Sequence, residues 1–158
     1  MGDKQDSEKF RNFALAFLRE AKEDLESAED LLDSERYSRV VFFCQQAVEK
    51  SVKALLEMEH IFVAEHDLSS FFVKFIYNNK DYNEFKEKIN LLFEIIDFFE
   101  GEAGKTRYPK EKGGKVVTPT EIYKIEDASS SLDKGNEAYS IVRQIFIKKF
   151  KFKESEIK

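Results

Sequence analysis

The chain has 158 residues, enough for one sizeable hydrophobic core and too few for two ordinary domains. Hydrophobic residues make up 42% of it and charged residues 36%, which is typical of a globular protein and excludes a disordered one. No run of about 18 apolar residues exists, so no membrane span is expected. The charged amino terminus lacks the apolar segment of a signal peptide, and we therefore expect a cytoplasmic protein.

Apolar residues recur at steps of three and four along most of the chain, which predicts helices. Both prolines and four of the six glycines fall between residues 101 and 119, so this is the one long connection. The periodic segments are 7–32, 37–57, 67–76, 81–99 and 118–146, of which 67–76 is short. We predict an all-α, up-and-down bundle of four long helices plus one short helix, with a core over about 7–150 and a frayed tail over 151–158.

The segment from Tyr37 to Glu57 is the expected central helix. Its small and aliphatic residues, with Cys44 among them, fall within an arc of roughly 160° that faces a core. Cys44 is the chain's single cysteine, and we interpret it as a small buried hydrophobe rather than a reactive thiol.

The remaining arc of this helix is polar but contains a phenylalanine. It carries Phe42, Gln46, Glu49, Lys50, Lys53 and Glu57. We predict that Phe42, Gln46, Glu49 and Lys53, called the polar seam below, form an interface with a second copy or a partner protein. Glu49 and Lys53 are also spaced as a simple surface ion pair worth about 0.3–0.5 kcal/mol.

The outer face of the first helix is acidic. It includes Glu20, Glu23, Asp24, Glu26, Glu29, Asp30 and Asp33. We interpret this strip as solvated, and it would repel nucleic-acid phosphates.

The segment over 101–117 has no helical period, and we expect a long exposed loop. From Lys105 to Lys115 it has five positive residues and one negative, a net charge of +4 in a chain of −5. Such residues can contact phosphates, and Tyr108 offers a ring on which a base can stack. A solvated mobile loop is the alternative interpretation. Thr118, Pro119 and Glu121 then predict the start of the last helix, with an N-cap, a first-turn proline and a capping box.

Two further motifs lack the partners that their chemistry needs. Gly104, Lys105 and Thr106 match only the end of a phosphate-binding P-loop, because position 99 is phenylalanine rather than glycine. Glu57 and His60 have the E-x-x-H spacing of di-metal bundles, which need that pair twice and two more glutamates. We therefore expect no metal and no cofactor.

Three ordered stretches resemble the HEPN family of small helical-bundle proteins: QAVEKSVKAL over 46–55, HDL over 66–68 and TRYP over 106–109. The first helix adds the similar pattern A-x-x-D-L-x-x-A over 21–28. The resemblance implies a single HEPN-like domain over 1–158, nucleotide or RNA binding, and homodimers. It also implies a small nucleotidyltransferase as a partner protein, in some cases within a toxin–antitoxin pair.

Many family members that cleave RNA carry an arginine followed four to six residues later by a histidine. No histidine follows Arg107 in this chain, although His66 precedes it. The proton-transfer residue is thus missing from its place, and we expect binding without cleavage, with His66 and Arg107 as the only catalytic candidates.

The predicted ligand-binding residues are Lys105, Arg107, Tyr108, Lys110 and His66. Two alternatives remain open at this point. One is an interaction or dimerisation module without a ligand of its own, and the other is a HEPN-type endoribonuclease toxin.

Overall fold

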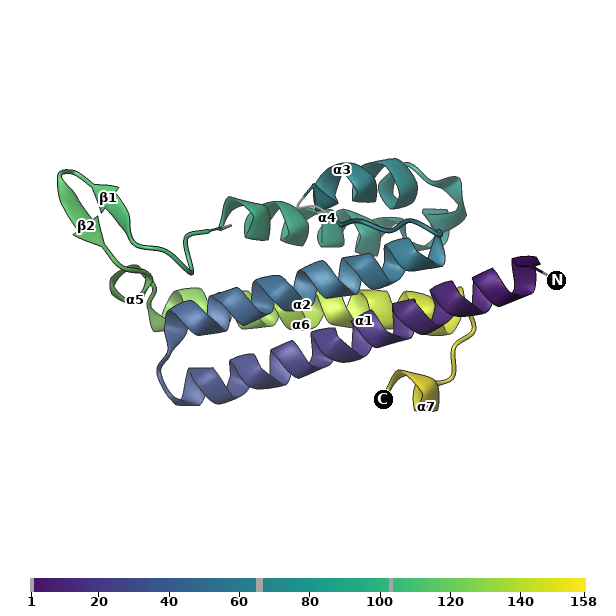
Figure 1. Cartoon of the computed structure of the whole chain (residues 1–158), viewed down its shortest axis with the longest axis horizontal. Helices are drawn as coiled ribbons and strands as arrows, with labels where there is room; N and C mark the ends of the chain where they lie inside the picture. The colour runs from purple at the N-terminus through teal and green to yellow at the C-terminus, as the bar shows by residue number, and fades with distance from the viewer. Residues whose placement is uncertain (1, 65–66, 103) are drawn as a thin grey trace.

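The computed structural model describes residues 2–64, 67–102 and 104–158. It is an all-α bundle with one small β-hairpin, which confirms the predicted fold class (Figure 1). The long helices are α1 (Gly2–Asp33), α2 (Tyr37–Met58), α4 (Lys86–Gly101) and α6 (Ile125–Lys148). The short elements are α3 (Leu68–Phe72), the π-helical turn η1 (Val73–Tyr77), the 3₁₀ helix η2 (Lys80–Phe85), β1 (Lys110–Lys112), β2 (Lys115–Val117), α5 (Pro119–Ile122) and α7 (Glu154–Ile157).

Helices α1 and α2 form an antiparallel pair, and α6 packs against both (Figure 1). The turn between the pair is tight because Glu35 adopts a left-handed backbone conformation, with φ of 58°. The Arg36 amide donates to the Leu31 carbonyl at 2.9 Å and closes this turn. Helix α4 packs on α2 and α6 and completes the four-helix core. Among the described helices, none has both the length and the apolarity needed to cross a membrane.

The apolar arc of α2 is buried, as its pattern predicted. Its side chains from Val40 to Leu55 that face α1 and α6 are at most 2% exposed. Cys44 is fully buried among them, and this burial raises the pKa of its thiol to about 12. The thiol therefore stays protonated at neutral pH, in keeping with its interpretation as a small hydrophobe.

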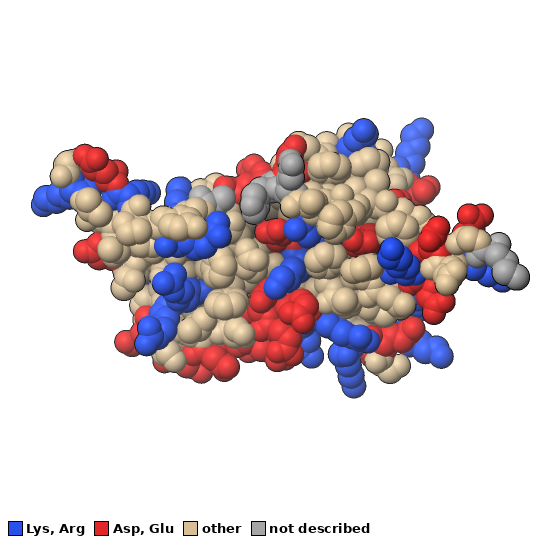
Figure 2. Space-filling view, viewed as in Figure 1, with Lys and Arg blue, Asp and Glu red and all other residues tan. Residues whose placement is uncertain are grey.

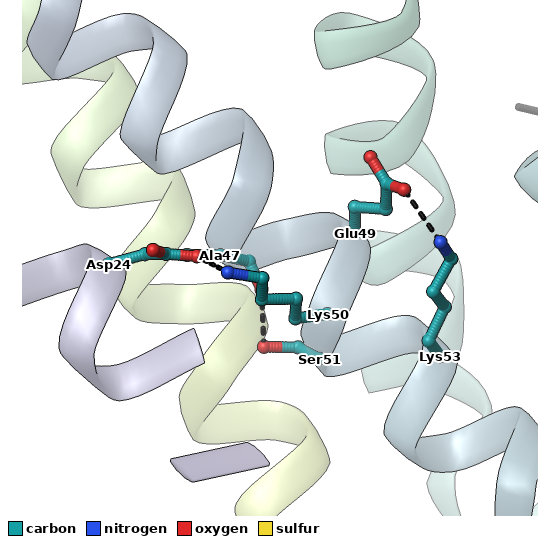
Figure 3. Close-up of polar contacts among 6 residues, drawn as sticks. All are labelled: Asp24, Ala47, Glu49, Lys50, Ser51 and Lys53. Atoms are coloured by element: carbon teal, nitrogen blue, oxygen red, sulfur yellow. Dashed lines mark hydrogen bonds and ion pairs between the residues drawn. The ribbon is translucent and has the colours of Figure 1, made fainter. Parts of the chain in front are cut away.

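Two charged residues that were expected on solvated faces are buried instead. Asp24, placed on the acidic strip, is 8% exposed and accepts a 2.7 Å hydrogen bond from the Lys50 ammonium across the α1–α2 contact (Figure 3). Glu57, placed on the polar arc of α2, is only 3% exposed. The prediction failed at both positions because a helical wheel assigns one buried face to each helix. In the structure, α1 and α2 each pack against more than one neighbouring helix.

The predicted loop over 101–117 is not structureless. Its second half is the antiparallel hairpin β1–β2, with Lys110 opposite Val117 and Lys112 opposite Lys115. Gly113 and Gly114 connect the strands with φ values of 59° and 81°. Two successive positive φ angles characterise a type I′ turn, whose twist matches that of the paired strands.

The capping box at Thr118 is present, but it begins a short helix. The Glu121 carboxylate accepts from the Thr118 amide at 2.7 Å, as predicted. Helix α5 then ends at Ile122, and the long helix α6 starts anew at Ile125. Tyr123 and Lys124 adopt extended conformations between them, which corrects the expectation of one continuous helix.

Three other boundaries differ from the sequence interpretation. Helix α1 begins at Gly2 rather than near residue 7. The predicted helix over 81–99 is divided into η2 and α4, and the Asn79 side chain caps η2 by accepting from the Asp81 amide at 2.9 Å. The tail over 151–158 is not frayed, because Phe152 and Ile157 pack into the core at 3% and 1% exposure.

Gly135 sets the spacing between α6 and the α1–α2 pair. A Cβ atom there would lie 2.9 Å from Leu25 Cδ2 and 3.4 Å from Cys44 Cβ. We expect Gly135→Val to lower the free energy of unfolding by about 1–3 kcal/mol, because a larger side chain overpacks this contact. Denaturant titration followed by circular dichroism measures the change.

The matched control is Gly101→Ala, since nothing lies within 4 Å of a Cβ atom at that position. Alanine should leave the stability unchanged or raise it by up to about 1 kcal/mol, because alanine is the better helix former. Equal stability of the Gly135→Val protein and the wild type would contradict this account of the helix spacing.

Glu57 should make stability depend on pH. Burial raises the pKa of its carboxyl above the ordinary value of 4.5, while nearby His60 acts in the opposite direction. Between 4.5 and the raised pKa, the folded state holds more protons than the unfolded state, so stability falls as pH rises through this window. We expect Glu57→Gln to be more stable than wild type at pH 7 and equally stable at pH 4, in urea titrations at both pH values.

Glu84→Gln, at an exposed position, is the control. If Glu57→Gln and Glu84→Gln gave the same pH dependence, Glu57 would not be the group responsible.

Candidate functional site

A cleft of about 650 Å³ lies between α2, the start of α3, α4 and the segment that follows α4. It is called the Arg107 cleft below. Helix α2 contributes Phe42, Gln45, Gln46 and Glu49, helix α4 contributes Phe99 and Glu100, and the following segment contributes Gly104 and Arg107. The cleft thus combines aromatic rings, two amides and one guanidinium within a single concave surface.

Arg107 is exposed and lies next to two aromatic rings. Its guanidinium carbon is 5.7 Å from the centre of the Phe42 ring and 5.4 Å from that of Tyr108. Cation–π contacts of this kind are worth about 0.5–1 kcal/mol at exposed sites. None of the ion pairs among the described residues involves Arg107, so its charge is available to an anion.

The segment that carries Arg107 is fixed to the helices at several points. Thr106 is fully buried, and its carbonyl accepts from Arg39 Nη1 at 3.3 Å. The Tyr123 hydroxyl donates to Glu102 Oε2 at 2.5 Å, which ties the end of α5 to the end of α4. Burial and this hydrogen bond to a carboxylate raise the pKa of Tyr123, so the hydroxyl remains a donor at neutral pH. Arg107 is therefore held beside α2 by its neighbours in sequence.

Three carboxylates line the cleft, those of Glu49, Asp67 and Glu100, and two of them accept hydrogen bonds from protein donors. Glu49 Oε1 accepts from the Lys53 ammonium at 2.8 Å, as its spacing in α2 predicted (Figure 3). Glu100 Oε1 accepts from the Ser69 amide in the first turn of α3 at 3.1 Å. These pairings reduce the repulsion that Glu49 and Glu100 would exert on an anion near Arg107.

The structure joins two surfaces that the sequence had suggested separately. Phe42, Gln46 and Glu49 of the polar seam line the same cleft as Arg107. The fourth seam residue, Lys53, touches this group through Glu49. Ligand binding and partner docking, which were assigned to different places, thus concern one surface.

The other predicted ligand-binding residues lie at varying distances from the cleft. Lys105 and Tyr108 are exposed beside Arg107, with Tyr108 at 62% exposure. Lys110 lies on β1, outside the cleft lining. His66 lies outside the described residues.

Arg39 is the supporting residue that the sequence interpretation missed. It lies three residues before Phe42 and seven before Gln46, so it shares their face of α2. This spacing was the available signal, but its partner, the Thr106 carbonyl, is 67 residues away in the chain. Gln45 was missed because the sequence analysis considered one face of α2, whereas the cleft is lined by Gln45 as well as by Gln46.

His60, the histidine that the structure describes, lies away from the cleft. His60 follows the far end of α2, where its ring stacks on Phe10 at 4.2 Å between centres. Phe42 lies near the opposite end of α2, more than about 20 Å away at 1.5 Å per residue. Among residues 2–64, 67–102 and 104–158, no group of three or more histidine, cysteine, aspartate or glutamate side chains could hold a metal ion.

Comparisons with known proteins agree with this architecture. The model of the HEPN domain matches residues 14–145. The chain is 33% identical over 142 residues to the protein named Putative toxin MJ1304 of Methanocaldococcus jannaschii, covering 90% of this chain and 93% of that protein. The crystal structure of TT1696 from Thermus thermophilus has the same fold, with a TM-score of 0.59, 20% identity, and coverage of 83% of this chain and 96% of that one. The family model spans most of the bundle and includes the Arg107 cleft, and the chain belongs to the HEPN domain family.

Proposed function

We propose that the protein binds a nucleotide or RNA in the Arg107 cleft. The observation that carries the proposal is the exposed guanidinium of Arg107, which lies within about 6 Å of two aromatic rings at a cleft of about 650 Å³. A guanidinium binds phosphate in a bidentate manner, and an exposed ring such as Tyr108 can stack on a base. One cleft therefore offers contacts to both parts of a nucleotide.

The size and lining of the cleft support a small polar ligand. Ligand pockets usually measure about 300–1,000 Å³ and combine apolar walls with a few polar groups. Gln45 and Gln46 supply side-chain amides, each able to donate and accept hydrogen bonds as the edge of a base requires. Phe42 and Phe99 supply the apolar wall.

Cleavage is not part of this proposal. RNA hydrolysis by general acid–base catalysis needs a group that moves a proton near the scissile phosphate. In the described lining, the groups that could move a proton are the carboxylates of Glu49, Asp67 and Glu100, and Glu49 and Glu100 accept hydrogen bonds from protein donors. The histidine that many RNA-cleaving family members carry after the arginine does not follow Arg107 in this chain. We therefore propose binding without cleavage, with no metal or cofactor.

We also propose that the protein acts as a homodimer or together with a small nucleotidyltransferase. The family resemblance of the motifs around Gln46 and Arg107 supports this. Phe42 and Gln46 are only half-buried in the single chain, so their apolar and amide groups are free to contact another protein.

A toxin is the second candidate function. It is favoured by one observation, the similarity of almost the whole chain to a protein named Putative toxin MJ1304. In that case Arg107 would stabilise the charge that develops on phosphate during cleavage, and a histidine or carboxylate would move the proton.

Arg107→Ala should weaken nucleotide binding at least about tenfold, because a hydrogen bond to a charged group is worth about 1.5–3 kcal/mol. The nucleotide affinity of Arg107→Lys should lie between those of the wild type and Arg107→Ala, because lysine keeps the charge but lacks the planar guanidinium. Isothermal titration calorimetry with AMP and ATP measures both affinities.

Arg143→Ala is the control, since Arg143 lies on α6 and faces Glu154 at 3.8 Å rather than the cleft. Unchanged AMP affinity in the Arg107→Ala protein would refute the site assignment.

Purified protein should leave single-stranded RNA intact, and induced expression should not arrest growth of a bacterial host, because no histidine follows Arg107 to move the proton. Gel electrophoresis of RNA after incubation and growth curves test the two statements. RNA degradation or growth arrest that disappears in the Arg107→Ala protein would favour the toxin over our leading proposal.

A further inference from the structure

The β1–β2 hairpin has a lysine face that the cleft does not use. Alternate residues of a strand point to the same side, so Lys110 and Lys112 share one face. The strand register places Lys115 directly opposite Lys112 on that same face. The other face carries Glu111 and Val116, which are also paired. The three lysines of this ribbon therefore lie on one face and its carboxylate lies on the other.

This arrangement is electrostatically unfavourable in the free protein. Side chains directly opposite each other have Cβ atoms about 4.5–5.5 Å apart, and like charges at such positions destabilise the pairing. None of the ion pairs among the described residues involves Lys110, Lys112 or Lys115. Lysines on an exposed strand do discourage edge-to-edge aggregation. That role does not explain why three of them face one way while the carboxylate faces the other.

The ribbon extends away from the helices and follows Arg107 closely in the sequence. It projects beyond the ends of α2 and α6 (Figure 1), and side chains of both charges lie at this tip of the molecule (Figure 2). The lysine face begins three residues after Arg107 and runs about 7 Å from Lys110 to Lys112, taking 3.3–3.4 Å per residue. A ligand held at Arg107 must therefore be longer than one nucleotide to reach Lys112 and Lys115.

We propose that the lysine face of the hairpin is a phosphate-binding track, and that the ligand of the Arg107 cleft is single-stranded RNA rather than a mononucleotide. This inference rests on the proposed function. Arg107 and Tyr108 hold one nucleotide, and Lys110, Lys112 and Lys115 contact the phosphates that follow it. The acidic strip of α1 repels the strand from the body of the protein and favours this path.

The turn and register of the ribbon suit such a track. Gly113 and Gly114 adopt positive φ angles in the two-residue turn, which holds the strands in the register that pairs Lys112 with Lys115. A phosphate between these two ammonium groups would replace their repulsion with two attractive contacts. The ribbon makes no base-specific contact in this arrangement, so the track is independent of sequence.

The test compares AMP with a short fluorescein-labelled oligoadenylate in the double variant Lys112→Gln/Lys115→Gln. Calorimetry measures AMP affinity, and fluorescence anisotropy at several salt concentrations measures RNA affinity. We expect AMP affinity to stay at the wild-type value, while RNA affinity falls roughly tenfold. The slope of log K against log salt should decrease in magnitude by about 1.4, because each phosphate contact on a single strand contributes about 0.7.

The control variant is Lys4→Gln/Lys80→Gln, which removes the same charge from exposed positions on α1 and η2. RNA affinity and salt slope equal to those of this control would overturn the track. Equal affinity of the wild-type protein for AMP and oligoadenylate would also overturn the track. The same holds if the hairpin variant changes the sedimentation of the protein but not its RNA affinity. In each case the proposed function stands as long as Arg107→Ala weakens AMP binding, whereas a wild-type protein that binds neither probe refutes both proposals.

Discussion

The burial of α2 between α1, α6 and α4 is the constraint on which the rest of the structure depends. Its apolar arc lies against α1 and α6, and even its polar residues Ser51 and Glu57 are buried. Each fully buried aliphatic side chain contributes about 1.5–3 kcal/mol, so this packing fixes the rotation of α2 about its axis. Once that rotation is fixed, Phe42, Gln46 and Glu49 face outward beside α4, and a cleft forms there.

The second constraint is the attachment of the positive segment to an acidic body. Buried Thr106, with its carbonyl bonded to Arg39, holds Arg107 at the cleft. The hydrogen bond from Tyr123 to Glu102 joins the two ends of the segment that connects α4 to α6. Carboxylates gather along α1 while the hairpin carries positive charge at the tip of the molecule (Figure 2). Because the carboxylates of α1 and the lysines of the hairpin lie apart, a polyanion is attracted more strongly to the hairpin than to α1.

The sequence could predict what depends on local periodicity and local hydrogen bonds. The four long helices follow from steps of three and four residues, and the Thr118–Glu121 capping box follows from its spacing. The hairpin escaped prediction because its strands have three residues each, and neither KEK nor KVV alternates apolar with polar residues. Asp24 and Arg39 escaped because their partners, Lys50 and the Thr106 carbonyl, come from other helices or distant loops. Long-range contacts of this kind leave no trace in a helical wheel.

The meeting of the polar seam and Arg107 in one cleft has a thermodynamic consequence. A protein docked on Phe42 and Gln46 would cover the groups that contact a nucleotide, unless the partner itself completed the site. Binding of the ligand and binding of the partner are then linked, and each changes the affinity for the other by the same factor. A partner that only covers the cleft makes this coupling negative, whereas a second copy or a nucleotidyltransferase that adds contacts to phosphate makes it positive. The sign of the coupling therefore distinguishes a surface that excludes the ligand from a site that two chains build together.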